Sequence, residues 1–219
     1  MRRQALFFSA ICALSVCAMA TTVTVSVIDK DGHPVPDAVV VVESGNAGTP
    51  GQALPMQATI AQEKMQFIPM VTVVPAGAKV TFVNDDPWAH HVQGSAAGAA
   101  QFNTTTGGFQ FMLAGRAPGK PPTSAEVTIE KPASTSALLF SCLIHGSMRG
   151  YVYVTDSPWT VKTGADGVAT LNDVPEGPAQ IKVWHADQLV DVPAQHVTLG
   201  SAPLTTKVQL SVVPRRSRI

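Results

Sequence analysis

The chain lacks an excess of charge of either sign, and charged residues are few. Its 219 residues include 15 Lys plus Arg and 15 Asp plus Glu. Without a basic excess, the composition gives no reason to expect binding to nucleic acid or to an anionic membrane surface. Hydrophobic residues reach 45%, with 17 Gly and 17 Pro. This composition favours a turn-rich all-β protein over a helical one, with room for one large or two small domains.

The first twenty residues predict a signal peptide rather than part of the fold. Arg2 and Arg3 form a basic start, residues 5–16 are apolar, and residues 18–20 read Ala-Met-Ala, a typical cleavage sequence. The apolar stretch is too short to span a bilayer stably, so we expect no transmembrane segment after cleavage. A retained anchor, or lipidation at Cys17, is the weaker alternative, since no small residue precedes that cysteine. We therefore expect export, to a bacterial periplasm.

Cysteine is also scarce, and export makes its scarcity informative. Of three cysteines, Cys12 and Cys17 fall in the predicted signal peptide, which leaves Cys142 alone in the mature chain. In an oxidising compartment a single cysteine cannot form an internal disulfide, and a free thiol is a liability. Coordination of a metal would hold the thiolate and protect it. The simpler alternative is a buried cysteine that acts as a small hydrophobic side chain.

A short segment places further donor atoms beside this cysteine. Residues 141–148 read Ser-Cys-Leu-Ile-His-Gly-Ser-Met, which puts a thiol, an imidazole and a thioether into one predicted loop. Thiolate and thioether together with imidazole form the ligand set that selects copper in electron-transfer sites. Such a site needs a second imidazole, and His90 and His91, about fifty residues upstream, can supply it in a Greek-key sandwich. Successive strand residues face opposite sides, so both rings cannot easily bind one ion.

These two segments resemble the copper-binding motifs of the cupredoxin (plastocyanin-like) family. The resemblance implies a Greek-key β-sandwich that holds one type 1 (blue) copper ion. It implies that His90, Cys142 and His145 bind the metal strongly and that Met148 is the long, weak axial ligand. An ordinary core position is the alternative for Met148. His91 would support the site or the strand pairing, and exchanged roles of His90 and His91 are the alternative.

Alternating and apolar runs predict strands along most of the mature chain. The runs cover residues 22–28, 36–42, 58–67, 69–77, 79–84, 126–130, 137–141 and 150–154. Residues 44–55, rich in Gly and Pro, predict a linker. Residues 94–124 show no clear period and predict a long, mobile loop with one strand at residues 109–112.

The C-terminal third is similar to a second known fold. Residues 163–184 contain strands separated by turns, similar to the later strands of a prealbumin-like module found as a regulatory domain beside carboxypeptidases. Residues 22–42 resemble the opening hairpin of that module. The resemblance implies a split prealbumin-like β-sandwich, and insertion at an exposed loop is tolerated where the host's chain ends lie close together. The implied parts are the signal peptide at 1–20, the split domain at 21–55 plus 156–213, the cupredoxin domain at 56–155 and a disordered tail at 214–219.

The mature chain as a whole resembles the exported bacterial proteins labelled methylamine utilisation protein, or plastocyanin-like. The most specific shared motifs are residues 86–92, residues 142–151 and residues 183–185. That family often has a polar residue after the cysteine and an acidic-aromatic pair before the methionine. Here Leu143 and the pair Gly146-Ser147 stand at those positions. The resemblance therefore implies the ligands but leaves the partner surface specific to this chain.

The remaining histidines carry no motif of their own. His33 lies in a predicted turn and His196 near a predicted strand, where solvated side chains are the ordinary case. His185 follows Trp184 as in the family, and no second motif accompanies it. We expect a structural role for His185.

A copper ion with three strong ligands and one weak one has no position open to substrate, unlike most catalytic metals. Multicopper oxidases and nitrite reductases need a His-Cys-His run, whereas Ser141 and Leu143 flank this cysteine. We therefore expect no independent enzyme activity. The leading hypothesis is a periplasmic blue-copper carrier that passes single electrons between a dehydrogenase or c-type cytochrome and another acceptor. Alternatives are a copper protein for storage, delivery or sensing, and a cell-envelope module that binds protein or glycan and whose copper is structural.

Overall fold

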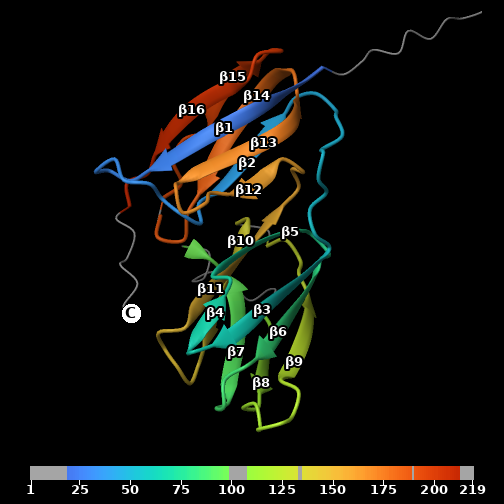
Figure 1. Ribbon diagram of the computed structural model, residues 1–219, viewed down its shortest axis with the longest axis vertical. Coiled ribbons are helices and arrows are strands. Elements are labelled where there is room, and N and C mark those ends of the chain that lie inside the picture. Colours follow the sequence, from blue (N-terminus) through green and yellow to red (C-terminus); the bar gives the residue numbers. More distant parts are fainter. Residues whose placement is uncertain (1–18, 99–107, 133–134, 189, 213–219) are drawn as a thin grey trace, which may run out of the picture.

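The protein consists almost wholly of β-strands, arranged as two stacked sandwiches (Figure 1). This computed structural model describes residues 19–98, 108–132, 135–188 and 190–212. Its strands are β1 (Ala20–Ile28), β2 (Val39–Ser44), β3 (Gln57–Glu63), β4 (Gln66–Ile68), β5 (Val71–Pro75), β6 (Lys79–Asn84), β7 (His90–Ala96), β8 (Gln110–Leu113), β9 (Thr123–Thr128), β10 (Ala137–Cys142), β11 (Arg149–Thr155), β12 (Thr160–Lys162), β13 (Val168–Pro175), β14 (Gly177–Trp184), β15 (Gln195–Leu199) and β16 (Leu204–Gln209). The predicted all-β class is confirmed.

Two predictions fall outside the described part of the chain. The signal peptide covers residues of which only Met19 and Ala20 are described, and the tail at 214–219 lies beyond residue 212. Within the described ranges, no helix has the length and apolar composition needed to cross a membrane.

The first sandwich, called the host, is formed by strands from the first 44 residues and from residues 160–209. Its two sheets have the orders β13-β1-β16 and β12-β2-β14-β15. In the first sheet, Val23 of β1 lies opposite Leu171 of β13 and, on the other side, opposite Leu204 of β16. Figure 1 shows the blue strand β1 between orange and red ones. Strands far apart in the sequence therefore share one sheet and one core.

The valine-rich alternation of β1 explains its place in the host. Val23, Val25 and Val27 are fully buried, while the Thr and Ser residues between them remain partly exposed. This pattern is the one expected of a strand with one face on a core. The turn that follows is held by Asp29, whose Oδ1 accepts the N–H of Asp31 at 2.8 Å and of His33 at 2.9 Å. The predicted turn thus uses its acidic side chain for backbone capping.

The second sandwich, called the insert, is formed by strands β3 to β11. Its sheets have the orders β5-β11-β10-β7-β8 and β4-β3-β6-β9. Aromatic rings dominate its core: Phe140 lies 4.8 Å from Phe67 and 5.2 Å from Phe82 between ring centroids, both edge to face. Such pairs add a favourable term of roughly 0.5–1.5 kcal/mol each beyond the area that they bury.

A tight turn between β3 and β4 was not evident in the sequence. Lys64 and Met65 both have positive φ angles, 52° and 57°, which side chains other than glycine seldom adopt. The carboxylate of Asp86 compensates by accepting the N–H of Lys64 at 2.7 Å and of Met65 at 3.0 Å. The predicted run from residue 58 to residue 67 is therefore a hairpin whose turn is fixed by Asp86, 21 and 22 positions after the two turn residues.

The long loop predicted at residues 94–124 is wrong at both ends. β7 continues to Ala96, where it pairs with Leu138 of β10, and β9 begins at Thr123, opposite Asn84. β8 covers residues 110–113, close to the predicted short strand. The sequence pattern failed at the end of β7 because the buried positions there are the small residues Gly94 and Ala96, which give no clear apolar alternation. The centre of the predicted loop, residues 99–107, lies outside the described residues.

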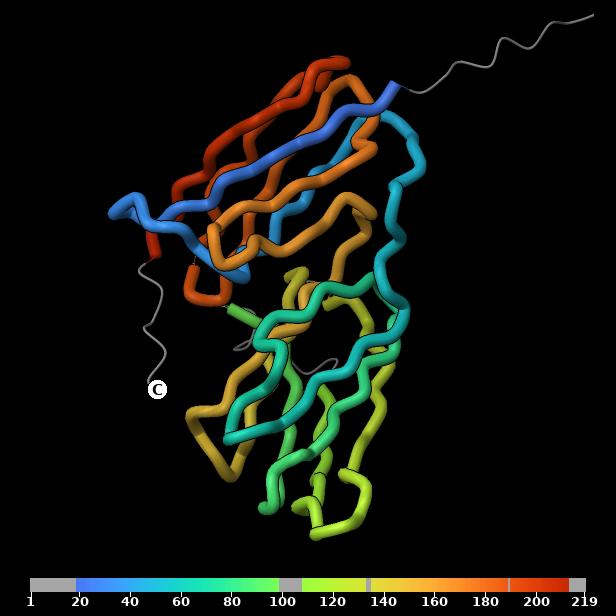
Figure 2. The backbone as a smooth tube through the Cα atoms, in the orientation of Figure 1, coloured from blue at the N-terminus to red at the C-terminus, as the bar shows by residue number. Residues whose placement is uncertain are grey.

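A third, small apolar cluster joins the two sandwiches. Val39 and Val41 of the host belong to it together with Val71 and Tyr153 of the insert. The Trp184 ring lies 5.5 Å from the Tyr153 ring, measured between centroids, and at the same distance from that of Tyr151. Figure 2 shows the linker before β3 descending along one side of the molecule to connect them. The junction is therefore packed and does not depend on the linker alone.

Candidate metal centre

Three donor atoms from two distant segments meet at one end of the insert. His90 is the first residue of β7, Cys142 is the last of β10, and His145 lies in the connection to β11. Cys142 Sγ lies 3.6 Å from Nδ1 of each histidine, and the two Nδ1 atoms are 3.1 Å apart. The connections β6–β7 and β8–β9 mark the end of the insert that faces away from the host (Figure 1). The structure thus brings together three of the four predicted ligands.

The spacing of these donors fits a metal ion. With metal–nitrogen bonds of about 2.0 Å and metal–sulfur bonds of about 2.3 Å at near-tetrahedral angles, donor atoms lie roughly 3.3–3.6 Å apart. Two imidazole nitrogens held 3.1 Å apart repel one another unless a proton or a cation lies between their lone pairs. A thiolate with two imidazoles is a donor set for copper or zinc.

The connection that leads to His90 is held by Asn84. The side-chain nitrogen of Asn84 donates to the carbonyl of Trp88 at 2.9 Å and to that of Ala114 at 3.0 Å. Its oxygen accepts the N–H of Asp86 at 3.0 Å. Asn84 is fully buried, so these bonds replace those it would make to water. The position of His90 is therefore fixed by the loop before it.

Asp86 sets the orientation of the His90 ring. His90 is fully buried, and its Nε2 lies 2.9 Å from Oδ2 of Asp86. Burial would raise the pKa of Asp86, but the N–H of Met65, the His90 ring and the N–H of Lys64 together lower this pKa below its ordinary value. The ionised carboxylate can only accept, so Nε2 carries a hydrogen, and Nδ1 is the nitrogen left to face a metal. Metal-binding histidines are commonly held by a carboxylate in this way.

Backbone hydrogen bonds also shape the loop that carries Cys142 and His145. The N–H of Leu143 donates to the carbonyl of His91 at 2.9 Å, which ties the loop to β7. The N–H of Met148 donates to the carbonyl of His145 at 3.0 Å, and that of Cys142 to the carbonyl of Met148 at 3.3 Å. The loop is thus closed upon itself, with Cys142 2% exposed.

Met148 lies immediately before β11 and is 1% exposed. Its side chain belongs to the apolar core of the insert, next to the loop just described. Its backbone bonds place it beside Cys142 and His145 in the chain fold. Its role as the axial ligand stays a prediction.

His91 faces away from the three donors. Its Nε2 lies 2.6 Å from the side-chain nitrogen of Gln110 on the neighbouring strand β8, and it is not part of the converging group. This placement agrees with the alternation of side chains along β7.

The other histidines lie outside the centre. His33 is exposed and lies 3.3 Å from Oδ2 of Asp29, whose other oxygen caps the turn. His196 is exposed on β15. His185 is buried; its Nδ1 accepts the N–H of Asp187 at 3.2 Å, and its ring also bonds to the carbonyl of Pro36. Burial lowers the pKa of His185, with partial opposition from Asp187.

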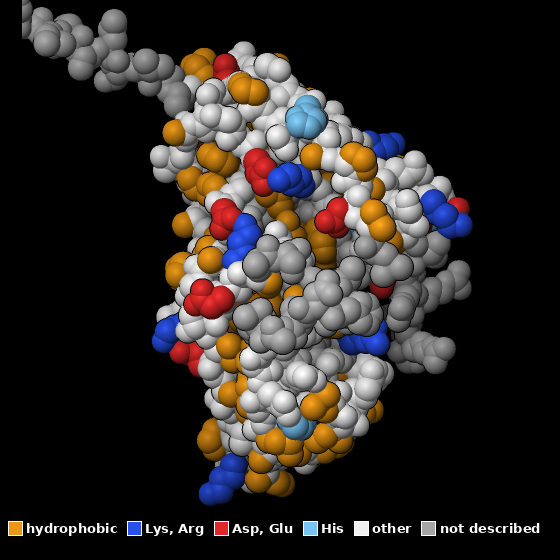
Figure 3. All heavy atoms as spheres, turned by 180° about the vertical axis from the view of Figure 1, so that it is seen from behind, with side chains coloured by type: hydrophobic (Ala, Val, Ile, Leu, Met, Phe, Trp, Pro, Cys, Tyr) orange, Lys and Arg blue, Asp and Glu red, His pale blue; other side chains and the backbone are white. Residues whose placement is uncertain are grey.

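The surface around the centre is apolar. Leu143 and Ile144 are each 52% exposed and Trp88 is 43% exposed, and His145 is half-buried. Figure 3 shows hydrophobic side chains gathered at the lower end of the molecule, over the insert. Gly146 and Ser147 add no charge to this surface, which we call the end patch (Trp88, Leu143, Ile144, His145 and Gly146).

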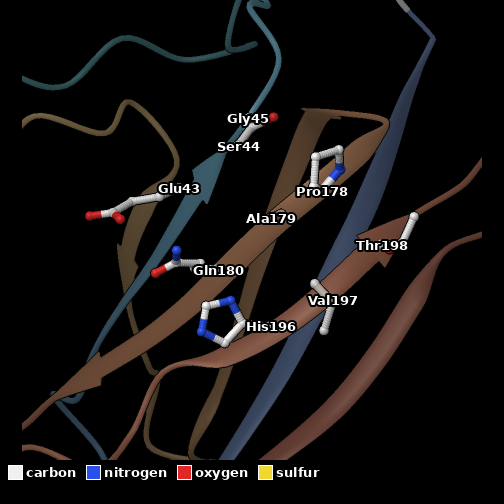
Figure 4. A pocket seen from close by; sticks show the side chains of 9 residues that line it. All are labelled: Glu43, Ser44, Gly45, Pro178, Ala179, Gln180, His196, Val197 and Thr198. Carbon is white, nitrogen blue, oxygen red and sulfur yellow. The ribbon is translucent and has the colours of Figure 1, made fainter.

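A hollow on the host differs from this centre in chemistry. It has a volume of about 530 Å³ and lies on β2, β14 and β15. Glu43, Gln180 and His196 stand side by side across the three strands (Figure 4). It has one imidazole and no thiol, so it does not offer the soft donors found in the insert.

One residue that positions the centre was not predicted from the sequence. Asp86 was noted only as part of a motif, although its position four residues before His90 was a usable signal.

Known proteins resemble parts of this chain. A family described as "Domain of unknown function (DUF7382)" matches residues 16–57, which include β1 and β2 of the host. No curated protein matches the sequence.

Three solved structures are similar to part of the chain. Amicyanin from Paracoccus versutus (Thiobacillus versutus) is 20% identical with a TM-score of 0.33, over 53% of this chain and 97% of amicyanin. Reduced auracyanin from Roseiflexus castenholzii is 21% identical with a TM-score of 0.35, over 47% of this chain and 98% of auracyanin. A purple cupredoxin from Nitrosopumilus maritimus is 20% identical with a TM-score of 0.31, over 45% of this chain and 99% of that protein.

Proposed function

We propose that this protein is a type 1 (blue) copper protein that carries one electron at a time between redox partners. The observation that carries the proposal is the convergence of His90 Nδ1, Cys142 Sγ and His145 Nδ1 at 3.1 to 3.6 Å in a mostly buried position. Cys142 is the only cysteine among the described residues, and it lies where two imidazoles meet it.

The ligands divide into strong and weak ones. Cys142 supplies the thiolate, and His90 and His145 supply imidazole nitrogens. Met148 supplies a thioether as the weak axial ligand. Bound copper would alternate between its two oxidation states in this set.

The fold contributes by fixing the positions of the donor atoms. Asn84 fixes the approach to His90, Asp86 fixes its tautomer, and the closed loop fixes Cys142 and His145. A ligand set that needs little rearrangement suits electron transfer, because reorganisation adds to the barrier. Coordination by the chain's own side chains leaves no position for a substrate, so we propose a carrier rather than an enzyme.

The partner and the compartment belong to the same proposal. The basic and apolar start of the chain supports export to the periplasm. The end patch supports docking of a redox protein such as a c-type cytochrome or a dehydrogenase, since brief encounters use small, weakly charged surfaces.

The absorption spectrum of the mature protein loaded with Cu(II) tests the proposal. We expect one copper per chain and an intense thiolate-to-copper band. Cys142→Ser should abolish the band and most of the copper affinity, because a hydroxyl is a poor soft ligand. Cys142→Ser with an unchanged spectrum would refute the assignment.

Cyclic voltammetry separates electron transfer from copper storage, delivery or sensing. A carrier should cycle reversibly without losing its metal. A protein that releases copper on reduction would support the alternative.

We also propose that the two sandwiches are separate domains, with residues 21–55 plus 156–213 forming one and residues 56–155 the other. The pairing of β1 with β13 and β16, and the separate apolar cores, support this division. Deletion of residues 21–43 should destabilise the remaining host strands and leave copper binding largely intact. Loss of copper with an unaffected C-terminal part would contradict it.

A further inference from the structure

The inner layer of the insert contains an amide whose polar atoms have no partner. Gln62 of β3 is fully buried, and neither its side-chain nitrogen nor its side-chain oxygen has a hydrogen-bond partner. Burying an amide without such bonds is unfavourable, because its bonds to water are lost and not replaced. Leucine would fill a similar volume without this cost. An unpaired buried amide calls for a partner from outside the chain, a bound water or a ligand.

The strand register places Gln62 at the metal end of the insert. β3 runs parallel to β6, and Gln62 lies opposite Asn84, the residue that holds the approach to His90. The carbonyl of Gln62 accepts the N–H of Asp85 at 3.0 Å. Residues opposite one another in a sheet point to the same face, and both Gln62 and Asn84 are fully buried. The amide of Gln62 therefore faces the sheet that carries Cys142.

The strand next to β3 leads from Gln62 toward the segment that follows Met148. On its other side Gln62 is opposite Phe67 of β4. The Cβ of Phe67 lies 3.1 Å from the position that a Cβ atom on Gly150 would take. Gly150 follows Met148 by two residues, at the start of β11. The layer that contains Gln62 thus meets the chain directly after the predicted axial ligand.

We propose that the amide oxygen of Gln62 is a further weak ligand of the copper centre; this rests on the proposed function. An amide oxygen is harder than a thioether and favours Cu(II) over Cu(I), and glutamine is a known type of axial ligand at such centres. Being neutral, it adds no charge to a buried site. Metal binding gives the oxygen the partner that it otherwise lacks.

The variant Gln62→Leu tests this inference in the full mature protein. Cu(II) and Cu(I) affinities are measured separately by competition with chelators of known affinity. We expect Cu(II) affinity to fall about tenfold or more, as for other changes next to a metal, and Cu(I) affinity to change by much less. A tenfold change in their ratio raises the reduction potential by about 59 mV for one electron. The copper hyperfine splitting in the EPR spectrum should change as well.

Thr72→Val is the matched control. Thr72 of β5 is another buried residue of the insert whose side-chain oxygen has no partner. Both substitutions remove an unsatisfied polar group, so both should raise the urea midpoint of the metal-free protein. Only Gln62→Leu should change the ratio of Cu(II) to Cu(I) affinity.

The outcomes separate the two levels of the proposal. A wild-type protein without a blue copper site overturns both the proposed function and the Gln62 ligand. A wild-type blue site with the same affinity ratio and EPR spectrum in Gln62→Leu overturns the Gln62 ligand alone. An equal change in Thr72→Val also overturns it, because the effect would then follow from repacking of the core.

Discussion

The host and the insert each bury a histidine, and the two rings differ in the partners of their nitrogen atoms. In the host, the ring of His185 has a partner on both sides, the N–H of Asp187 and the carbonyl of Pro36. In the insert, His90 uses only Nε2 within the fold, toward Asp86, and its Nδ1 faces a thiol and another imidazole. Burial alone therefore does not mark a ligand. A buried ring with one nitrogen bonded within the fold and the other directed at a thiol and a second imidazole is the arrangement expected of a ligand.

The cores around these two histidines also differ in composition. The host core is built mainly of valine, with Trp159 as its aromatic member. The insert core contains several phenylalanines and also buries the polar or soft residues Gln62, Asn84, His90 and Cys142. The insert thus gives part of its interior to the candidate site, whereas the polar residues that the host buries, such as Asp29, Thr163 and His185, bond to nearby backbone groups.

Substituting each buried histidine by glutamine should have the largest effect and the sharpest contrast. His90→Gln should abolish the copper band, because the fixed imidazole nitrogen is lost. His185→Gln should keep the band and lower the free energy of unfolding by about 1–3 kcal/mol, since buried backbone groups lose their partner. Absorption and urea unfolding of both variants measure this. Loss of the band in His185→Gln would show that the two sandwiches do not act separately.

The carboxylate behind His90 should have the next largest effect. In Asp86→Asn the amide nitrogen can face Nε2, which favours the wrong tautomer of His90, and copper affinity should fall about 10–100-fold. Competition with a chelator measures the affinity. Asp85→Asn is the control: its carboxylate bonds Arg116 at 3.0 Å near the surface, and its loss should change affinity little. Equal losses in both variants would mean that net charge, rather than ring orientation, matters.

Lowering the pH should destabilise the host through His185. The pKa of His185 is lowered in the folded protein from its ordinary 6.5. Below about pH 6.5 the unfolded chain therefore binds a proton at this histidine that the folded chain does not bind. The free energy of unfolding falls with the pH until the folded-state pKa is reached. The urea midpoint of the metal-free protein between pH 7.5 and pH 5 measures this loss. His185→Gln should reduce the slope and the exposed His196→Gln should not; equal slopes in all three proteins would contradict the assignment.

The smallest effect concerns docking at the end patch. A side chain at Gly146 fits, since an added Cβ meets no atom within 4 Å. Gly146→Glu should slow electron transfer to a periplasmic cytochrome a few-fold and leave the spectrum unchanged, because a charge on an apolar patch must lose water on docking. Stopped-flow oxidation at two salt concentrations measures the rate, with Gly146→Ala as the control.

The docking prediction has two ways to be wrong. Equal rates in wild type and Gly146→Glu would show that electrons leave by another face. A strong salt dependence of the wild-type rate would indicate charged docking.

The sequence allowed the donors and the fold class to be predicted, but only part of what holds them. Cys142, His145 and His90 stood in recognisable motifs, and the alternation in β1 predicted its buried face. The turn at Lys64 and Met65 was not predictable, because it has no glycine and depends on Asp86 through a contact outside its own segment. The partnerless amide of Gln62 was not predictable either. Satisfaction of a polar group is a property of its surroundings in the folded chain.

The pairing of β1 also bears on the order in which the chain folds. The hydroxyl of Thr21 donates to the carbonyl of Ala202, 181 positions further along. The partners of β1 are so distant in sequence that the strand stays unpaired until most of the chain has been synthesised or has refolded. During that time its valines are exposed and can aggregate with other chains. The strands of the insert pair only with one another, within residues 57–155, so all their partners lie nearer in the sequence. We expect refolding in two phases, with the insert folding before the host. The insert could then bind a metal ion before β1 has paired with β13 and β16.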